Sequence, residues 1–279
     1  MTPLRLEAPA KLNLSLAITG RRADGYHELA SVFVLLDLAD RLLLLPGAPG
    51  LRVEGSDEVP LGAANLAWRG LAAGLGAEPD ATCLALEKAI PVAAGLGGGS
   101  SDAAAAWRLG RRWSGASEPA KPGSLAAIGA DVPFFAAELP AAYVTGIGER
   151  VEPLPAPHPT PYVLLVVPTF GLRTAAVFAE LRSSDWSAAP SRTLEPGRND
   201  LLAAARRLRP EIDDLVGLML AAGADPHLSG SGPTLFALTD DPERARSIGE
   251  HLGVRGVRAI VTRLRDAAAR IEAIEEEEG

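Results

Sequence analysis

The first half of the chain contains segments whose apolar residues alternate with polar ones, or form short runs, as in β-strands. Residues 4–18 alternate with a break at Pro9, and residues 31–45 form a run rich in leucine and valine. Residues 51–55 are expected to pair with that run, and residues 81–90 have the pattern of a further strand. We therefore expect a sheet in this half.

Helical segments accompany these strands. Asn65 is a suitable N-cap for a helix that is stopped by glycines about ten residues later. An alanine-rich segment that ends at Trp113 favours a second helix, with Ser100 or Ser101 as its N-cap and Asp102 near the positive end of its dipole. A strand, a glycine-rich turn and a helix thus follow one another.

A proline-dense stretch at residues 153–161 resists regular structure and is the best candidate for a domain boundary. We expect an N-terminal domain over residues 1–156 and a C-terminal domain over residues 157–279. The strand and helix patterns are mixed rather than strictly alternating, which favours an α+β fold. The other expected elements are a short helix after Ser124, a hairpin at 141–151, strands at 162–167, 234–238 and 257–264, helices at 174–181, 201–208, 212–222, 242–252 and from 266 onward, and a long Ser/Pro-rich loop at 183–199.

Composition and charge narrow the function classes. The chain has 279 residues, 47% of them hydrophobic, and a formal net charge of −8. Its 24 arginines and three lysines are scattered, so we expect neither a nucleic-acid partner nor a membrane partner. No secretion signal or apolar span of about eighteen residues is visible, and we expect a cytoplasmic protein. A single cysteine, Cys83, excludes an internal disulfide, and four dispersed histidines argue against a zinc site.

The segment from Pro91 to Ala103 carries most of the chemical information. Four glycines in five residues allow positive φ angles and a close approach of the backbone, so that several N–H groups can converge on an anion. The N-terminus of the following helix points to the same place, and the hydroxyls of Ser100 and Ser101 can reach phosphate oxygens or a bound Mg²⁺. We expect a phosphate-binding loop.

Two commoner nucleotide motifs do not fit this loop. A Walker A loop needs Gly-Lys followed by Ser or Thr, and the chain contains no Gly-Lys pair. In a dinucleotide fingerprint aligned on Gly97 and Gly99, the third glycine would be Asp102, whose carboxylate is the wrong group beside a pyrophosphate. The remaining alternative is that the glycines form only a tight turn and C-cap.

Several segments together resemble a known superfamily. Residues 91–103 resemble the second motif of the GHMP kinases, and the glycine turn at residues 229–233 is similar to their third motif. Three further segments resemble the diphosphocytidyl-methylerythritol kinase branch: Pro9-Ala10-Lys11-Leu12-Asn13-Leu14, Asp24-Gly25-Tyr26-His27-Glu28-Leu29 and Gly129-Ala130-Asp131-Val132-Pro133-Phe134-Phe135.

This resemblance implies a GHMP kinase fold, with an N-terminal domain similar to the second domain of ribosomal protein S5, a ferredoxin-like C-terminal domain, and a site between them. The implied reaction moves the γ-phosphoryl group of ATP to the 2-hydroxyl of 4-diphosphocytidyl-2-C-methyl-D-erythritol, in the non-mevalonate isoprenoid pathway, with Mg²⁺ as cofactor. The oligomeric state stays open between a monomer and a homodimer.

Phosphoryl transfer needs bound phosphates, a compensating charge and a residue that orients the acceptor hydroxyl. The resemblance implies that Asp131 accepts the hydroxyl proton, although an Asp at this position is also a common N-cap. Lys11 is expected to stabilise the incipient alkoxide and to keep Asp131 ionised, the alternative being a strand lysine that extends to solvent. The residues expected to bind ATP are Asn65, Pro91, Val92, Ala93, Ala94, Gly95, Leu96, Gly97, Gly98, Gly99, Ser100 and Ser101.

Tyr26 and His27 offer a stacking group and a hydrogen-bonding group for a cytosine ring. By resemblance Phe178 closes the other face of the ring, although it sits on an apolar helix where a core position explains it nearly as well. Asn13 and Thr174 are similar to substrate-contacting positions.

Two other polar segments can be explained by a structural role as well as by a role in the site. Lys88 lies beside the loop but could simply form ion pairs with acids at the surface. Asn199-Asp200 could equally be the cap of the helix that follows.

Two rival functions remain at this point. A GHMP kinase for another small alcohol, such as mevalonate or homoserine, would keep the glycine loop without needing Tyr26 and His27. A non-catalytic nucleotide-binding module is the other rival, and the presence of both Lys11 and Asp131 argues against it.

Overall fold

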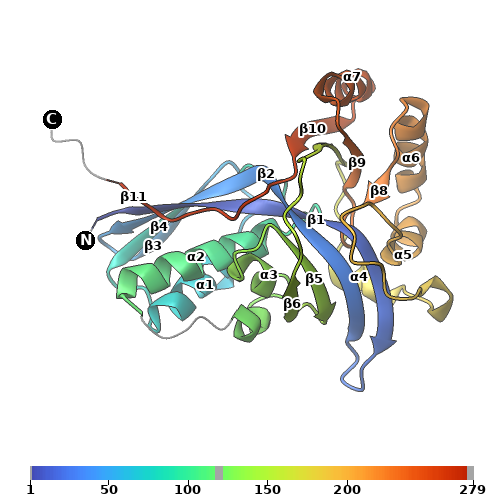
Figure 1. Ribbon diagram of the computed structural model, residues 1–279. Helices are drawn as coiled ribbons and strands as arrows, with labels where there is room; N and C mark the ends of the chain where they lie inside the picture. The colour runs from blue at the N-terminus through green and yellow to red at the C-terminus, as the bar shows by residue number, and fades with distance from the viewer. Residues whose placement is uncertain (1, 117–121, 275–279) are drawn as a thin grey trace.

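The computed structural model describes residues 2–116 and 122–274. Two long antiparallel strands, β1 (Leu4–Arg21) and β2 (His27–Pro46), run through the middle of the molecule (Figure 1). The break expected at Pro9 is a register shift between Pro9 and Lys11 within β1. Residues 8–18 of β1 are all buried, as in a strand that is covered on both faces.

The larger sheet has the strand order β11-β1-β2-β4-β3, with β5 pairing with β2 and β6 pairing with β5. Helices α1 (Leu66–Leu75) and α2 (Gly98–Ser114) lie against one face of it (Figure 1). These helices pack almost backbone to backbone, because a Cβ atom on Gly70 would lie 2.1 Å from the carbonyl oxygen of Ala103. The remaining elements of this part are β3 (Gly50–Glu54), η1 (Gly62–Ala64), β4 (Thr82–Glu87), η2 (Pro122–Ala127), α3 (Val132–Ala136), β5 (Ala141–Gly146), β6 (Arg150–Pro153) and β11 (Glu272–Ala273).

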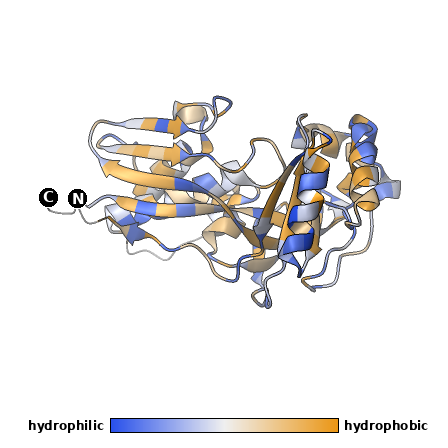
Figure 2. Cartoon of the chain, turned by 90° about the horizontal axis from the view of Figure 1, so that it is seen from above, coloured by the Kyte–Doolittle hydropathy of each residue, from blue (hydrophilic) through white to orange (hydrophobic). Residues whose placement is uncertain are grey.

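The smaller sheet is antiparallel, with the order β10-β7-β9-β8. Its first and last strands, β7 and β10, are neighbours. Helices lie between β7 and β8 and between β9 and β10, whereas β8 and β9 are joined by the glycine turn, which is the ferredoxin-like arrangement. The expected α+β class is therefore confirmed, and the order of the smaller sheet agrees with the expected ferredoxin-like domain. Figure 2 shows α7 over this sheet, with hydrophilic positions facing the viewer. The elements are β7 (Tyr162–Val167), α4 (Thr174–Ala179), η3 (Ser183–Asp185), α5 (Leu201–Leu208), α6 (Glu211–Ala221), β8 (His227–Leu228), β9 (Leu235–Thr239), α7 (Pro242–Gly253) and β10 (Arg258–Arg263).

The two sheets share an apolar core. Leu12 and Val34 of the long strands belong to the same buried cluster as Val163, Leu165 and Phe236 of the smaller sheet. The proposed domain boundary after residue 156 falls between β6 and β7, although β11 returns to the larger sheet. Burial of this common core fixes the two halves relative to each other and so positions the cleft between them.

Two of the expected elements are wrong. Residues 51–55 do not pair with the second strand. Strand β3 instead pairs with β4, and the two strands are parallel. The chain between them is long and contains α1, which is the kind of crossover connection that parallel strands need. No helix begins at residue 266 within the described residues. Extended chain instead packs Ala269 and Ile271 on the core before β11 pairs with β1, and residues 275–279 lie outside the description.

Two smaller expectations also change. The helix after Ser124 is a 3-10 helix, and α2 begins at Gly98 with Gly97 as its cap, so Ser100 and Ser101 lie inside its first turn rather than before it.

Candidate active site

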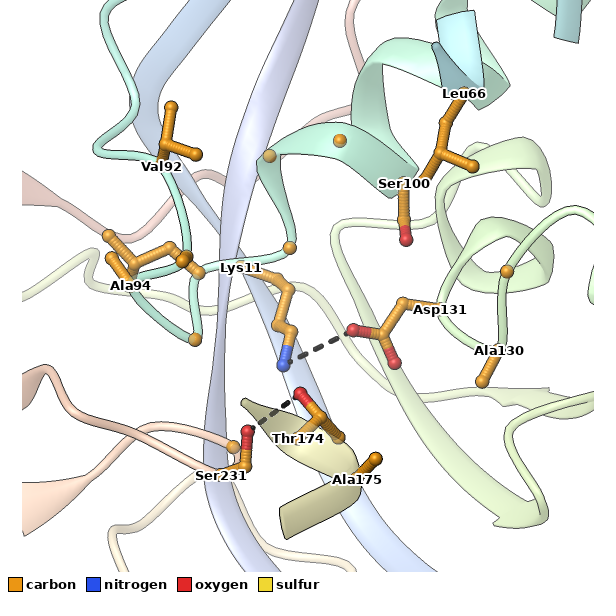
Figure 3. Close-up of a pocket in the computed structure, with 18 of the residues that line it drawn as sticks. Lys11, Leu66, Val92, Ala94, Ser100, Ala130, Asp131, Thr174, Ala175 and Ser231 are labelled. Carbon is orange, nitrogen blue, oxygen red and sulfur yellow. Dashed lines mark hydrogen bonds and ion pairs between the residues drawn. The ribbon is translucent and has the colours of Figure 1, made fainter. Parts of the chain in front are cut away.

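A cleft of about 1180 Å³ lies between the two parts of the molecule (Figure 3). Strand β1, the glycine loop, the start of α2, the turn before α3, the β1–β2 hairpin tip, α4 and the glycine turn at 229–233 all contribute to its wall. Elements from both halves of the chain therefore meet around one space, which is large enough for two bound small molecules.

The backbone of residues 91–99 is shaped for close approach. Gly95 and Gly97 have φ angles of +78° and +72°, which glycine adopts without strain. A Cβ atom on Gly97 would lie 2.9 Å from the ring of Phe135 and 3.0 Å from the side chain of Lys11. A Cβ atom on Gly99 would meet little beyond Leu66 at 3.5 Å, so this side of the loop faces the cleft. The loop and the N-terminus of the long helix α2 together form an anion-binding site.

Lys11 and Asp131 face each other across this cleft, with 3.5 Å between Lys11 Nζ and Asp131 Oδ2 (Figure 3). The Lys11 side chain is buried, lies over the ring of Phe33, and donates a hydrogen bond of 2.5 Å to Asn13 Oδ1. Asp131 precedes α3, but among the described residues its side chain accepts no capping hydrogen bond from that helix. The N-cap alternative for Asp131 and the solvent-lysine alternative for Lys11 therefore do not describe these side chains.

The two loop serines lie on different sides of α2. Ser100 lines the cleft, and its hydroxyl points toward the side where Asp131 lies (Figure 3). Ser101 is 1% exposed and borders a separate small cavity with Pro9 and Arg108; its hydroxyl has no hydrogen-bond partner in the described part of the chain. The structure therefore does not bring Ser101 to the expected ATP and metal site, because successive residues of a helix point about 100° apart.

Lys88 forms a buried cluster beside the glycine loop. Its partners are buried carboxylates and not the surface acids that the sequence left as an alternative. Its ammonium forms an ion pair with Asp40 and donates to Asp102 Oδ2 at 2.7 Å. Asp40 also accepts hydrogen bonds of 2.6 and 2.8 Å from the backbone N–H groups of Ala89 and Ile90. The sequence signal for this cluster was the use of lysine in a chain that otherwise carries its positive charge on arginine. The partner Asp102 lies fourteen positions later, so the pairing itself could not be read from the sequence.

The charges within this cluster are coupled. Burial is the largest influence on Asp102 and raises its pKa to about 8; Lys88 opposes this rise and Asp40 adds to it. Burial also lowers the pKa of Lys88, but the two carboxylates together outweigh burial and raise that pKa. Burial and Asp40 thus favour the protonated form of Asp102, and the Lys88 ammonium compensates its charge when it is ionised, so it is less of an obstacle to a phosphate than a free carboxylate.

Aromatic side chains gather at another part of the cleft wall. The ring centroids of His27 and Phe178 are 5.6 Å apart, and Trp186 lies edge-on to His27 at 6.1 Å. Tyr26 is 61% exposed beside them. Burial, aided by the charge of Arg21, lowers the pKa of His27, which favours a neutral imidazole at neutral pH. Trp186 does not line the cleft among the described residues; it packs against a buried apolar cluster and contacts His27 from there.

The other expected contacts also line the cleft. The hydroxyl of Thr174 lies 3.0 Å from that of Ser231, so α4 touches the glycine turn (Figure 3). Asn65 caps α1 by accepting from Ala67 N at 2.8 Å and lines the same cleft. Of the expected site residues, the structure brings together Lys11, Asn13, Tyr26, His27, Asn65, Pro91, Val92, Ala93, Ala94, Gly95, Leu96, Gly97, Gly98, Gly99, Ser100, Asp131, Thr174 and Phe178.

Residues 2–116 and 122–274 hold no group of three or more His, Cys, Asp and Glu side chains that could bind a metal ion by themselves. None of the helices in these ranges is both long and apolar enough to cross a bilayer.

Comparison with known proteins identifies the family. Residues 58–138 match the GHMP kinases N terminal domain, and residues 177–255 match the family model described as GHMP kinases C terminal. The 4-diphosphocytidyl-2-C-methyl-D-erythritol kinase of Dinoroseobacter shibae is 41% identical over 273 residues, which cover 91% of this chain and 91% of the relative. The chain belongs to the 4-diphosphocytidyl-2-C-methyl-D-erythritol kinase family. Membership in this kinase family confirms the branch that the sequence motifs indicated.

Further relatives support membership in the 4-diphosphocytidyl-2-C-methyl-D-erythritol kinase family. The protein of that name from Thermus thermophilus is 40% identical over 265 residues, covering 89% of this chain and 92% of the relative. A crystal structure of 4-(cytidine 5'-diphospho)-2C-methyl-D-erythritol kinase has a TM-score of 0.78 at 35% identity, covering 93% of this chain and 98% of that one. A homoserine kinase from Cytophaga hutchinsonii has a TM-score of 0.66 at 19% identity, covering 98% of each chain, which shows a shared fold alone.

Proposed function

We propose that this kinase transfers the γ-phosphoryl group of ATP to the 2-hydroxyl of 4-diphosphocytidyl-2-C-methyl-D-erythritol, a step of the non-mevalonate isoprenoid pathway. The observation that carries this proposal is the Lys11–Asp131 pair, which faces the glycine loop inside one cleft. Family membership supports the choice of acceptor, since relatives at about 40% identity bear the name of this substrate.

The residues divide the work of the reaction. The loop N–H groups and the α2 N-terminus hold the phosphates of ATP, while Asp131 accepts a hydrogen bond from the 2-hydroxyl and orients its oxygen toward the γ-phosphorus. That oxygen bonds to the γ-phosphorus as the bond from phosphorus to the β–γ bridging oxygen breaks. ADP leaves, the hydroxyl proton passes to Asp131, and the ammonium of Lys11 stabilises the negative charge on the oxygen that attacks.

The residues present fit a magnesium ion that is bound largely by the nucleotide. Mg²⁺ prefers oxygen ligands and keeps several waters, and the Ser100 hydroxyl lies at the helix start beside the expected phosphates. When bound, Mg²⁺ neutralises charge on the β- and γ-phosphates. We propose Ser100, and not Ser101, as the protein group next to it.

The aromatic part of the cleft suits the cytidine end of the acceptor. Tyr26 exposes a ring face on which a base can stack, and Phe178 offers a second face. A neutral His27 carries one donor and one acceptor nitrogen, which matches the mixed edge of cytosine. This pocket favours the cytidylyl acceptor over mevalonate or homoserine, which have no ring to stack.

Phosphate-label transfer from ATP with Mg²⁺ tests the proposal, with 4-diphosphocytidyl-2-C-methyl-D-erythritol, mevalonate and homoserine as parallel acceptors. We expect transfer to the cytidylyl acceptor alone, and loss of transfer with retained ATP binding in Asp131→Asn. Preferred transfer to mevalonate or homoserine would contradict the choice of substrate. Unchanged function in Asp131→Asn would point to a non-catalytic module. The cytoplasmic location and the monomeric or homodimeric state stay predictions.

A further inference from the structure

Asn199 stands at a junction between parts of the cleft that are distant in the sequence. The chain holds three asparagines and no glutamine, and the other two, Asn13 and Asn65, both line the cleft. Asn199 is 8% exposed, and its Oδ1 accepts a hydrogen bond of 2.9 Å from Leu201 N at the start of α5. This contact satisfies the first backbone N–H of α5 from one residue before the N-cap, which is Asp200 and makes no side-chain capping hydrogen bond of its own.

The amide nitrogen of Asn199 makes contacts that a cap does not need. Its Nδ2 donates to the carbonyl oxygens of Leu228 at 2.9 Å and Gly230 at 2.8 Å, so both N–H bonds hold the glycine turn at 229–233. Serine or aspartate would cap the helix equally well but could not donate twice. The side chain thus provides what only an amide can.

The backbone around Asn199 is fixed on the strand that carries Lys11 and Asn13. Gly197 N donates to the carbonyl of Leu14 at 2.7 Å, and the carbonyl of Arg198 accepts from Leu16 N at 3.0 Å. On the other side of Asn199, the Asp200 carboxylate accepts from Ile18 N at 2.9 Å. Residues 197–200 therefore follow β1 and have little freedom to shift.

The turn that Asn199 holds is in close contact with the reaction centre. A Cβ atom on Gly230 would lie 3.2 Å from both Lys11 Nζ and Asn13 Oδ1. On the phosphate side, the hydroxyl of Ser229 donates to the carbonyl of Gly95 at 3.1 Å, and Gly95 has room for no side chain against this turn. A displacement of the turn would therefore reach the catalytic lysine and the phosphate loop together.

We propose that Asn199 is a positioning residue that holds the glycine turn between β1 and the phosphate loop and so aligns bound ATP with the acceptor alcohol. The inference rests on the proposed phosphoryl transfer. Asn199 itself does not line the cleft in the described structure, so it acts through the turn and not on the substrates.

The test compares Asn199→Ser and Asn199→Asp with a control at another helix cap. Both variants keep an oxygen for Leu201 N, and the aspartate also places a carboxylate against two carbonyl oxygens. Asp241 caps α7 by accepting from Glu243 N and Arg244 N, and Asp241→Ala removes a cap of similar kind away from the residues that line the cleft.

A positioning role changes kcat more than KM, because reactants that bind normally are then misaligned. We expect kcat to fall about tenfold in Asn199→Ser and about a hundredfold in Asn199→Asp, with KM for ATP within about threefold of wild type. We also expect ADP to form in excess over phosphorylated product, as water replaces the misaligned alcohol. Asp241→Ala should lower Tm and leave kcat and the product ratio unchanged.

An Asn199→Ser enzyme with kcat within about twofold of wild type and equal amounts of ADP and product overturns the proposal and leaves only a helix cap. The proposal is also overturned if the apparent kcat of a variant falls only in proportion to the fraction of unfolded protein, which thermal melting measures. Failure of the proposed function would show differently: the wild type itself would prefer another alcohol. The three variants are then assayed with that alcohol, and their ratios to wild type decide the role of Asn199 independently.

Discussion

Two lysines border the cleft, and the protein holds them in opposite ways. Lys88 is packed between Asp40 and Asp102, and all three side chains are at most 5% exposed. Lys11 is equally buried, but its carboxylate partner Asp131 stands 3.5 Å away with 31% of its side chain exposed. One ion pair is closed and the other is open toward the cleft.

The difference fits a structural role for the closed pair and the proposed catalytic role for the open pair. Closed, buried ion pairs recover their desolvation cost only with complete hydrogen bonding, and Asp40 obtains this from Lys88 and two backbone N–H groups. The Asp131 side chain is partly exposed, so a hydroxyl group can approach it beside Lys11. The predictions that follow should therefore separate loss of activity from loss of stability.

Removing the open pair should have the largest effect. We expect Asp131→Asn and Lys11→Met each to lower kcat about a thousandfold, because each removes a group that acts on the hydroxyl in the transition state. Steady-state kinetics measures kcat, and calorimetric titration with ATP serves as the control for an intact nucleotide site. A variant within about tenfold of wild type would assign the chemistry to another residue.

Removing the closed lysine should instead reduce stability. We expect Lys88→Met to lower the free energy of unfolding by about 3–5 kcal/mol, since it leaves buried Asp40 without its counter-charge. Urea denaturation measures this change. The matched control is Arg41→Met, which breaks an exposed pair with Glu87 at 3.7 Å and should cost at most about 1 kcal/mol. Equal losses in the two variants would refute the distinction between buried and exposed pairs here.

A smaller effect is expected where the acceptor stacks. Phe178→Ala should raise KM for the cytidylyl acceptor about tenfold, the loss of one stacking face, with KM for ATP unchanged. Phe170→Ala is the control, because Phe170 packs in the same apolar cluster and does not line the cleft among the described residues. If both substitutions raise this KM equally, Phe178 acts through the core and not on the base.

The smallest effect is a pH dependence of stability at Asp102. Its pKa is 3.8 in its ordinary environment and about 8 in the folded protein, so between these values the folded state binds the extra proton and wild-type stability falls as pH rises. Asparagine does not titrate. The unfolding free energy of Asp102→Asn relative to wild type should therefore increase by about 1 kcal/mol from pH 7 to pH 8 and level off above. A difference that is constant over this range would mean that Asp102 is ionised throughout.

What could be predicted from the sequence was local. The glycine loop is one continuous segment whose φ angles and following helix depend on neighbouring residues. Residues 91–100, which were expected to bind ATP, all line the cleft, and their contact with ATP stays a prediction. Ser101 was misassigned by a single residue, because the helix begins at Gly98 and this start sets which way each serine points.

The contacts that could not be predicted join distant parts of the chain. The parallel pairing of β3 with β4 depends on the crossover through α1, and the Lys88 cluster unites residues 40, 88 and 102. Asn199 has the local signature of a helix cap, and its second role is visible only once the glycine turn folds back to it. Hydrophobic periodicity records which face of an element is buried, and it does not record its partner.

The strand β11 ties the far end of the chain to its beginning. Leu4 lies opposite Ala273, on the flank of β1 that does not contact β2 (Figure 1). During synthesis on the ribosome, the larger sheet therefore stays one strand short until residue 273 has emerged. A chain that ended before residue 272 would lack the pairing of β11 with β1. The edge of β1 would then be unpaired and open to neighbouring molecules.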